Sequence, residues 1–399
     1  MQTNTLTSLK NVPGIGGLSI AIMLLGFATS FAQPYLSLFG VTEIGMSPIA
    51  LGFFLTTIAL SSIVISTLLG RLSDRLPSRK PVVLLSVACA ALGYTLYALT
   101  ENYLLLLTAV VFIGTGAASF PQLFALAKAQ AGTAGEQSMT ALRSLFSLAW
   151  VVGPGIGAAL LAAGGFRGLF LTTAACFALA AVPILRTSAR AREAARANPV
   201  APAPPSAASG TDRPVALVAL SFVLYGTSMH MGSVALPIHV TQVLHGTTSD
   251  VGLLVGLCAL LEIPVMLSFV VSARRLSNEK LILWGIALFV LYFVLVLLSP
   301  SVWWLAVAQA VRAVVIAILA TLGMAYVQEL MPDRVGVATT LYANTMNAGA
   351  LLGGLGVGLC AQFFGYTAVF VLCALLSVAS WALLLATRRG LGKRTPAPI

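Results

Sequence analysis

Charged residues are what this sequence has least of. Asp, Glu, Lys and Arg make up only 8% of its 399 residues, against about 25% in soluble domains. Hydrophobic residues make up 59%, and the mean hydropathy is +0.98. Because a soluble fold must present a wetted exterior, this composition excludes an ordinary soluble domain. The chain requires a second, apolar solvent, and a lipid bilayer provides one.

The signatures of enzymes and metal sites are also missing. The sequence contains neither H-E-x-x-H nor G-x-S-x-G, the patterns of zinc proteases and serine hydrolases. The five cysteines lie in apolar runs without metal-ligand spacing, as small buried hydrophobes do. His230 and His239 are nine residues apart, so one helix turns them to opposite faces. We therefore predict no enzyme activity, no cofactor and no metal site.

Long apolar runs fill the rest of the chain. A membrane span takes about 20 residues at a rise of 1.5 Å each, and twelve such spans are predicted, at 16–39, 48–69, 81–99, 103–126, 138–162, 168–185, 215–240, 251–272, 281–298, 302–327, 336–362 and 366–386. The first run has an alternative interpretation as a cleaved signal sequence, since Ser30-Phe31-Ala32 resembles a cleavage site. Its removal would leave an odd number of spans and place the two ends of the chain on opposite sides of the membrane. Because basic residues lie near both ends, we interpret this run as a span.

The basic residues are distributed unevenly between the two sides of these spans. Of the 22 Lys and Arg residues, 19 fall in segments on the side of the N-terminus, while Arg167 lies on the other side and Arg143 and Arg312 fall within spans. The positive-inside rule therefore places both termini in the cytoplasm. We predict a multi-pass protein of the bacterial inner membrane, surrounded by lipid. Because topology explains the net charge of +11, no nucleic-acid partner is expected.

The chain divides into two similar halves. A Pro/Ala/Ser-rich stretch predicts a cytoplasmic linker at 187–213, between six-helix bundles at 1–186 and 214–399. At an offset of 200 residues, DRLPSRK (74–80) aligns with RRLSNEK (274–280), and GFRGLF (165–170) aligns with GYTAVF (365–370). The predicted fold class is an all-α integral membrane protein with twelve transmembrane helices in two bundles. Transporters with such repeats bind substrate between them.

One short loop is unusually rich in charge. GRLSDRLPSRK, at 70–80, resembles the signature of the major facilitator superfamily between the second and third spans, with Gly70, Asp74, Arg75 and Arg79 at matching places and Pro77 in place of the usual glycine. The resemblance implies the major facilitator fold, and a conformational latch that holds the two halves in the outward-open state. Asp74 suits that role because a carboxylate accepts hydrogen bonds from a helix N-terminus or an arginine. The alternative is that the loop charges only anchor topology.

Other stretches narrow the resemblance. FPQLFALA (120–127), RSLFSLAWVVGP (143–154), LEIPVM (261–266) and QELMPDRVGVATTLYAN (328–344) are similar to the sugar efflux transporter family within that superfamily. The resemblance implies export of sugars, lactose or glucosides among them, by proton antiport. GPGIG at 153–157 is similar to the Gly-Pro motif of facilitator antiporters, although helix packing alone also accounts for it.

Ionisable groups at membrane depth are costly and tend to face cavities. The chain keeps three of them, at Arg143, Glu262 and Arg312. In the resembling fold the fifth and eighth spans meet across the halves, so Arg143 and Glu262 are expected to approach each other, directly or through a bound hydroxyl. The alternative pairs Glu262 with Arg312 within the second half. A proton on Glu262 is predicted to couple the transport cycle, because burial favours the uncharged form of an acid.

A sugar pocket needs amides, a charged group and an aromatic platform. The predicted substrate-binding set is Gln33, Gln122, Arg143, Trp150, His230, Glu262, Asn344 and Asn347. Asn344 and Asn347 are three residues apart and share a helix face, as do Arg143 and Trp150, which are seven apart. Each side chain has the alternative of bonding a neighbouring helix.

These features predict a secondary active transporter that exports small sugars or glycosides by alternating access, with protons as the second partner. Three alternatives stay open. A multidrug/proton antiporter on the same fold would carry apolar, cationic cargo, and a non-transporting membrane sensor would keep the fold unchanged. A membrane-embedded enzyme would need a nucleophile, base or metal cluster, which the sequence does not show.

Overall fold

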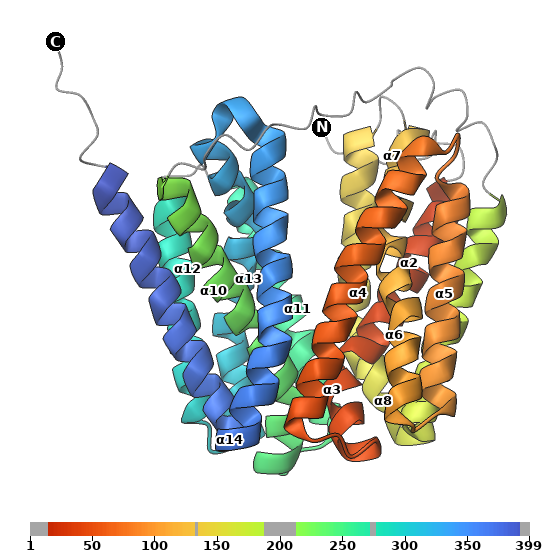
Figure 1. The fold of residues 1–399 in the computed structure, drawn as a ribbon, viewed down its shortest axis with the longest axis horizontal. Coiled ribbons are helices and arrows are strands. Elements are labelled where there is room, and N and C mark those ends of the chain that lie inside the picture. The colour runs from red at the N-terminus through yellow and green to blue at the C-terminus, as the bar shows by residue number, and fades with distance from the viewer. Residues whose placement is uncertain (1–14, 132–134, 187–212, 272–276, 392–399) are drawn as a thin grey trace. The chain divides into compact units, whose positions relative to one another are not determined.

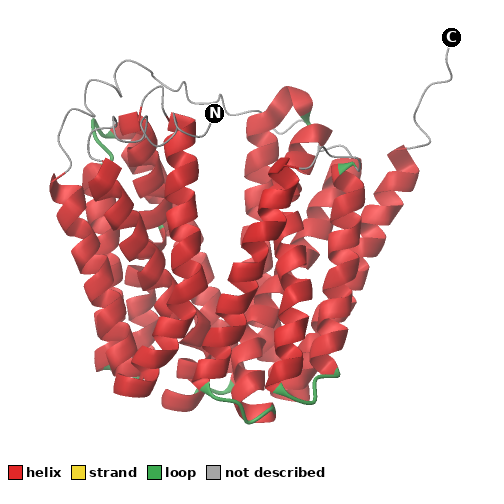
Figure 2. Ribbon diagram, turned by 180° about the vertical axis from the view of Figure 1, so that it is seen from behind, coloured by secondary structure: helices red, strands yellow, loops and turns green. Residues whose placement is uncertain are grey.

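The computed structural model describes residues 15–131, 135–186, 213–271 and 277–391. Over these ranges the chain is built of helices and short loops, without a strand (Figure 2). Most of the predicted linker, 187–212, lies outside the described residues, as do Arg274 and Arg275. The prediction of an all-α fold is confirmed for the part of the chain that the structure describes.

Contacts divide the chain into two compact units. Unit 1 comprises Met1–Met46 and Thr57–Ala201, and unit 2 comprises Ser47–Thr56 and Pro202–Ile399. The division follows the predicted halves except at Ser47–Thr56, which packs with unit 2. Within unit 2 this segment lies directly against a later helix, because a Cβ added at Gly52 would be 2.6 Å from Gly358 Cα. The two helix backbones can approach this closely only because both positions are glycine and neither has a Cβ atom.

The elements of unit 1 follow one another through short connections (Figure 1). They are α2 (Ile15–Ala32), η1 (Gln33–Tyr35), α3 (Leu36–Leu38), η2 (Phe39–Glu43), α4 (Pro48–Arg75, whose first residues belong to unit 2), α5 (Lys80–Leu99), α6 (Tyr103–Ala117), α7 (Ser119–Ala131) and α8 (Gly135–Arg186). Helices α2 and α5 both pack against α8.

Unit 2 repeats this order. Its elements are α10 (Arg213–Ile238), η4 (His239–Val243), α11 (Thr248–Val271), α12 (Asn278–Leu297), α13 (Val302–Leu330), η5 (Pro332–Arg334) and α14 (Val335–Leu391). Helix α14 packs along α10 and α12, and α13 packs against α11 and α12.

Ten helices in the described ranges are long and apolar enough to cross a membrane. Two of them are much longer than one crossing requires: Leu142–Arg186 has 45 residues and Pro332–Thr387 has 56. A crossing needs about 20. Each long helix breaks at a glycine with positive φ, Gly165 (φ 61°) and Gly365 (φ 81°), and α14 visibly turns back on itself (Figure 1). The ten helices and two breaks thus correspond to the twelve predicted spans.

The repeat at an offset of 200 residues extends to irregular backbone. A π-helical turn follows the first long helix of each unit, Phe39–Glu43 in unit 1 and His239–Val243 in unit 2. The first residue of each turn meets a phenylalanine ring edge-to-face, at Phe170 with 4.8 Å between centroids and at Phe370 with 5.1 Å. Because π-turns are rare, their recurrence at the same offset is strong support for two copies of one architecture.

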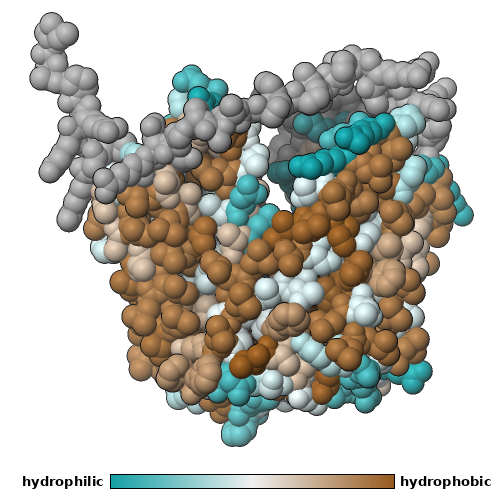
Figure 3. Space-filling view, viewed as in Figure 1, coloured by the Kyte–Doolittle hydropathy of each residue, from teal (hydrophilic) through white to brown (hydrophobic). Residues whose placement is uncertain are grey.

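The hydropathy of the surface changes along the helices, as expected for a protein that crosses a membrane. Hydrophobic residues cover the sides of the helices, and hydrophilic residues gather toward the helix ends (Figure 3). Helix contacts inside the units use small polar residues, as is common where lipid removes the hydrophobic drive between helices. In unit 2, for example, the Ser221 and Ser380 hydroxyls lie 2.9 Å apart, and Ser228 Oγ donates to the Cys373 carbonyl at 2.9 Å.

The Gly-Pro motif of α8 serves this packing in unit 1. A Cβ at Gly153 would lie 1.8 Å from Ser30 Oγ on α2, and one at Gly157 would lie 2.8 Å from the Phe31 carbonyl oxygen. The Tyr35 hydroxyl donates to the Pro154 carbonyl at 2.6 Å. The structure therefore shows the motif in the packing role that its sequence left as an alternative.

We predict that Gly153→Ala destabilises the protein by about 1–3 kcal/mol, because the added methyl group overpacks the contact with Ser30. Gly155→Ala is the matched control, since no atom lies within 4 Å of its added Cβ. This control should be neutral or stabilising by up to about 1 kcal/mol, as Ala is the better helix former. Thermal unfolding of the purified protein in detergent measures both, and equal effects would contradict the packing role.

Candidate functional site

Polar side chains gather at two places in the described part of the chain, one in each unit. In unit 1 they surround the short loop between α4 and α5. In unit 2 they lie inside the bundle, around a buried arginine on α13. We name the first the loop network (Ser73, Asp74, Arg79, Gln122) and the second the Arg312 cluster (Ser233, Glu262, Tyr292, Gln309, Arg312).

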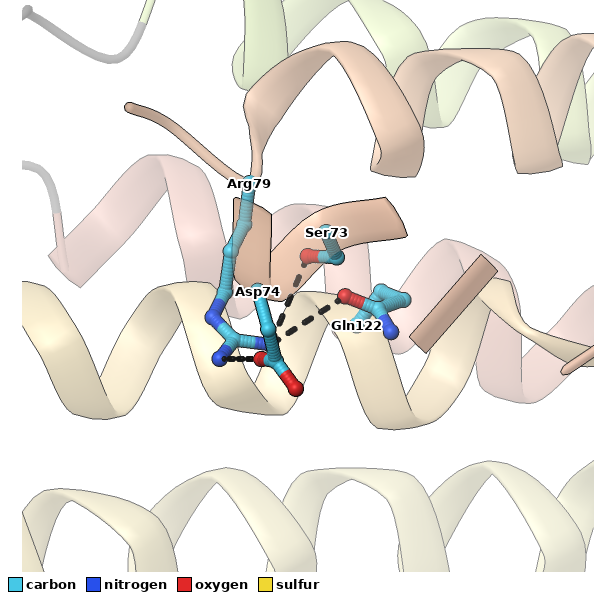
Figure 4. A network of polar contacts seen from close by, with 4 residues as sticks. All are labelled: Ser73, Asp74, Arg79 and Gln122. Atoms are coloured by element: carbon cyan, nitrogen blue, oxygen red, sulfur yellow. Dashed lines mark hydrogen bonds and ion pairs between the residues drawn. The ribbon is translucent and has the colours of Figure 1, made fainter. Parts of the chain in front are cut away.

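Arg79 is the centre of the loop network (Figure 4). Its Nη2 lies 2.5 Å from Asp74 Oδ1, and its Nη1 donates to Ser73 Oγ at 3.4 Å and to Gln122 Oε1 at 3.5 Å. A planar guanidinium presents several donors in a fixed fork, so one side chain joins the end of α4 to the first turn of α7. The exposed fractions of Arg79 and Asp74 are 33% and 66%, hence water screens the pair and its net energy is small.

The neighbouring residue extends the network to a fourth helix. Lys80 Nζ donates to the Leu185 carbonyl at 2.6 Å, at the last turn of α8, where a cation is favourable. A Cβ added at Gly70 would lie 4.0 Å from Gln122 Nε2, an ordinary contact, so the packing here does not require glycine. Arg75 is exposed in the last turn of α4. The observed contacts of the signature lie inside unit 1, and the predicted latch between the halves stays a prediction.

Gln122 was expected in the substrate-binding set, and the structure assigns it a different neighbour. Its side chain is 6% exposed and accepts a hydrogen bond from Arg79. In this structure its amide oxygen therefore belongs to the loop network. This contact could not be predicted from residue spacing, since 43 residues separate the two side chains.

We predict that Arg79→Ala loosens the loop, because a single side chain bridges α4 and α7. Amide hydrogen exchange over 73–80 and around Gln122 should rise, since local opening becomes cheaper. Arg71→Ala is the control: it removes the same charge from the same signature, on an exposed residue outside the network. An equal rise in exchange in both variants would show that charge alone, rather than the Arg79 contacts, orders the loop.

Helix α13 positions the Arg312 cluster. Its buried residues recur every three or four positions, from Leu305 through Arg312 to Tyr326, the spacing of one helix face. Arg312 and Gln309 are three residues apart and share this face. Arg312 and Gln309 therefore lie on the face of α13 that points into the bundle.

The guanidinium of Arg312 has two close partners. Its Nη2 donates to Ser233 Oγ on α10 at 2.7 Å, and its Cζ lies 5.8 Å from the ring centroid of Tyr292 on α12. A ring face attracts a cation at this distance. Arg312 is only 8% exposed, whereas Ser233 is exposed. The side chain therefore runs from the interior of unit 2 toward its surface.

Glu262 lies on α11, which packs against α13, the helix of Arg312. No salt bridge joins the two, because Asp74 with Arg79 is the one pair within 4.0 Å among the described residues. Glu262 is partly exposed. The alternative that pairs Glu262 with Arg312 within the second half therefore stays a prediction. Arg143 belongs to unit 1, and its predicted approach to Glu262 stays a prediction.

The sequence analysis did not identify three members of the cluster, Gln309, Tyr292 and Ser233. Gln309 is fully buried, and its side chain lies beside that of Tyr292, which is 1% exposed. Buried polar groups are normally satisfied. A Gln-x-x-Arg pair in an apolar run was a readable signal for Gln309, because ionisable residues at this depth mark functional sites. Ser233 and Tyr292 come from other helices, and only the fold brings them there.

The remaining predicted residues lie on accessible faces. Gln33 is exposed in the 3₁₀ turn that ends α2, and Asn344 and Asn347 are both exposed on α14. His230 is exposed on α10, three residues before Ser233, so the two share a face. His230 therefore lies on the side of α10 that receives the hydrogen bond from Arg312.

Arg143 and Trp150 lie on α8 in unit 1, the first exposed and the second partly buried. Trp150 belongs to a row of rings that the sequence analysis did not identify. The Trp150 and Phe146 centroids are 6.5 Å apart, and Phe146 lies 4.1 Å from Phe120 on α7. Such a row offers an apolar surface of the kind that a sugar ring face packs against. Within the described ranges no three His, Cys, Asp or Glu side chains come together as metal ligands.

Long apolar helices that carry an arginine and an acid at mid-span indicate a multi-pass membrane protein with a function inside the membrane. The family model described as Major Facilitator Superfamily matches residues 18–231 and 218–398. The chain belongs to the major facilitator superfamily, a class of transporters rather than enzymes. The resemblance of the loop at 70–80 is confirmed.

Curated relatives cover nearly the whole chain. A protein of Deinococcus radiodurans, whose name contains the words sugar efflux transporter, is 48% identical over 386 residues, 95% of this chain and 99% of its own. Sugar efflux transporter C of Escherichia coli (strain K12) is 32% identical over 374 residues, 92% of this chain and 94% of its own.

Solved structures share the fold. The crystal structure of nucleoside transporter NupG superposes with a TM-score of 0.81 at 13% sequence identity, covering 94% of this chain and 99% of that one. At so low an identity the similarity shows the architecture alone.

Proposed function

We propose that this protein exports small sugars or glycosides across the bacterial inner membrane. The observation that carries the proposal is the similarity, over 92–95% of the chain, to two proteins whose names describe sugar efflux. The polar residues support it: exposed amides at Gln33, Asn344 and Asn347 and an exposed His230 offer hydrogen bonds to hydroxyls. The aromatic row of Trp150 offers a surface for the ring face of the same substrate.

The mechanism that we propose is alternating access. The two units rock about a site near the middle of the membrane, and breakable contacts hold each end state. The loop network suits one such contact, because its ion pair is exposed and weak enough to exchange partners. The uneven distribution of basic residues supports cytoplasmic termini, with this loop on the cytoplasmic side.

Proton antiport through Glu262 completes the proposal. A carboxyl group at mid-span alternates between a neutral form favoured by burial and a charged form favoured by a nearby cation. Arg312 is such a cation: its helix α13 packs against α11, which carries Glu262, and no salt bridge joins the two side chains. The acid is therefore placed to release its proton in one state and to regain it in the other.

Uptake into inverted membrane vesicles tests export directly. Radiolabelled lactose, glucose and methyl glucosides are offered to vesicles with and without an acidic interior. We expect uptake of at least one sugar, enhanced by the pH gradient. Uptake of cationic dyes in place of every sugar would favour a multidrug antiporter, and the absence of any uptake would favour a sensor.

We predict that Glu262→Gln abolishes the enhancement by the pH gradient, because an amide carries no exchangeable charge. Equilibration of sugar down its own gradient should persist. The control is Glu101→Gln, which changes an exposed loop carboxylate and should leave the enhancement intact. Gradient-driven accumulation at the unmodified level in Glu262→Gln would overturn the coupling role.

A second prediction concerns the aromatic row. Trp150→Ala should raise the KM for sugar about 10-fold, since stacking on a ring contributes about 1–1.5 kcal/mol. Trp150→Phe should raise it less, because a smaller ring face is retained. Trp303→Ala is the control, as that side chain is 75% exposed at the start of α13. An unchanged KM in Trp150→Ala would remove Trp150 from the binding surface.

A further inference from the structure

The interactions of Arg312 leave most of its hydrogen-bonding capacity unused. A guanidinium has five N–H donors, and the structure shows one hydrogen bond from this one, to Ser233. The Tyr292 ring contributes a cation–π contact but accepts no hydrogen bond from it. Arginine at membrane depth costs several kcal/mol unless it is well solvated or paired. The chain itself therefore uses one of the donors of this cation, and the others are available to a ligand.

The opposite charge stands on a neighbouring helix, without a direct ion pair. Glu262 lies on α11, which packs against α13 and its Arg312, and no nitrogen–oxygen distance between the two side chains falls within 4.0 Å. A pair that served structure alone would gain most from direct contact with its hydrogen bonds satisfied. Two opposite charges held apart at this depth are better explained by a polar group that fits between them.

Contacts with neighbouring helices restrict the conformation of the guanidinium. Ser233 holds one nitrogen from α10, and the Tyr292 ring lies against the guanidinium from α12. Tyr292 is 1% exposed and Gln309, one turn before Arg312, is fully buried. Ser233 in contrast is exposed, so a ligand at the surface of unit 2 reaches the guanidinium beside it. Preorganised donors of this kind are typical of binding sites.

We propose that Arg312 is a substrate-binding residue, which grips a pair of neighbouring sugar hydroxyls together with Glu262. The guanidinium donates to one hydroxyl oxygen, and the Glu262 carboxylate accepts the O–H of the other. Ser233 and Tyr292 are positioning residues, since they act through Arg312. The inference rests on the proposed function and narrows it: the substrate has to present a vicinal diol.

This arrangement joins sugar binding to the proposed proton cycle. Protonated Glu262 loses about half of its strength as an acceptor, because charge-assisted hydrogen bonds are roughly twice as strong as neutral ones. The site therefore holds the diol best when Glu262 is ionised, that is, after its proton has left. Sugar and proton compete for one carboxylate, as antiport requires.

The experiment uses the full-length protein in inverted vesicles, with radiolabelled methyl glucoside and lactose as probes and their monodeoxy analogues as competitors. In the unmodified protein, two deoxy analogues that lack adjacent hydroxyls should compete about 10- to 100-fold less well than the others, the cost of a charge-assisted hydrogen bond. If no two adjacent positions stand out, the diol site is wrong.

Variants of Arg312 then assign the contact. Arg312→Gln should raise the KM for sugar about 10- to 100-fold and erase the penalty at one of the two deoxy positions, because the lost hydroxyl no longer has a charged partner. Glu262→Gln should erase the penalty at the other position. Arg312→Lys keeps the charge without the fork and should fall between. Retention of both penalties in Arg312→Gln would overturn the assignment.

Positioning by Ser233 has its own readout. Ser233→Ala should raise the KM several-fold with little change in kcat, and Ser233→Thr should restore it by returning the hydroxyl. Ser268→Ala, on an exposed hydroxyl of α11, is the matched control. An unmoved KM in Ser233→Ala would contradict the role of Ser233.

The outcomes separate this inference from the proposed function. If the unmodified protein transports none of the sugars, both fall together. If it transports them while Arg312→Gln keeps the KM and both penalties, export stands and the diol site falls. If Arg312→Gln fails to fold, the analogue series on the unmodified protein and on Arg312→Lys still decides the question.

Discussion

Hydrocarbon offers no hydrogen bonds, so every polar group carried into the membrane must find its partner within the chain or its ligand. This constraint explains most of what the structure shows. Hydroxyls on α10 and α14 bond one another and backbone carbonyls, and Tyr35 caps a carbonyl at the proline of α8. Against that background the Arg312 cluster is an exception. Its buried guanidinium makes one hydrogen bond within the chain, to Ser233, and no salt bridge, which is why we propose that the cluster binds substrate.

Close backbone contact is the second consequence of the same solvent. Without a hydrophobic drive between helices, stability comes from packing and from short hydrogen bonds. Glycines therefore occupy the positions where helices cross, as Gly153 does against Ser30 and as Gly52 and Gly358 do against each other in unit 2. The loop network differs from these contacts because it is exposed to water. Water reaches Asp74 and Arg79, so those contacts order a loop at little energetic cost and break easily.

The sequence predicted the fold well because the relevant signals are local. Length and hydropathy set the spans, and the offset of 200 residues predicted a repeat that the π-turns at Phe39–Glu43 and His239–Val243 display. The two breaks at Gly165 and Gly365 fall within segments that the repeat had already aligned. The site was less predictable. Glu262 and Arg312 were visible as charges in apolar runs, but Ser233 and Tyr292 join them from separate helices, and Gln122 turned toward Arg79 through contacts that no spacing announces.

The paired turns carry one more consequence. Phe39 packs among aromatic rings, whereas His239 occupies the equivalent place with both ring nitrogens buried and unpartnered. An imidazole there pays a desolvation cost that a phenyl ring avoids. The two halves can therefore guide substitutions in each other. Where they differ at equivalent positions, as at Phe39 and His239, the residue without buried unpaired polar atoms is a candidate for the other half.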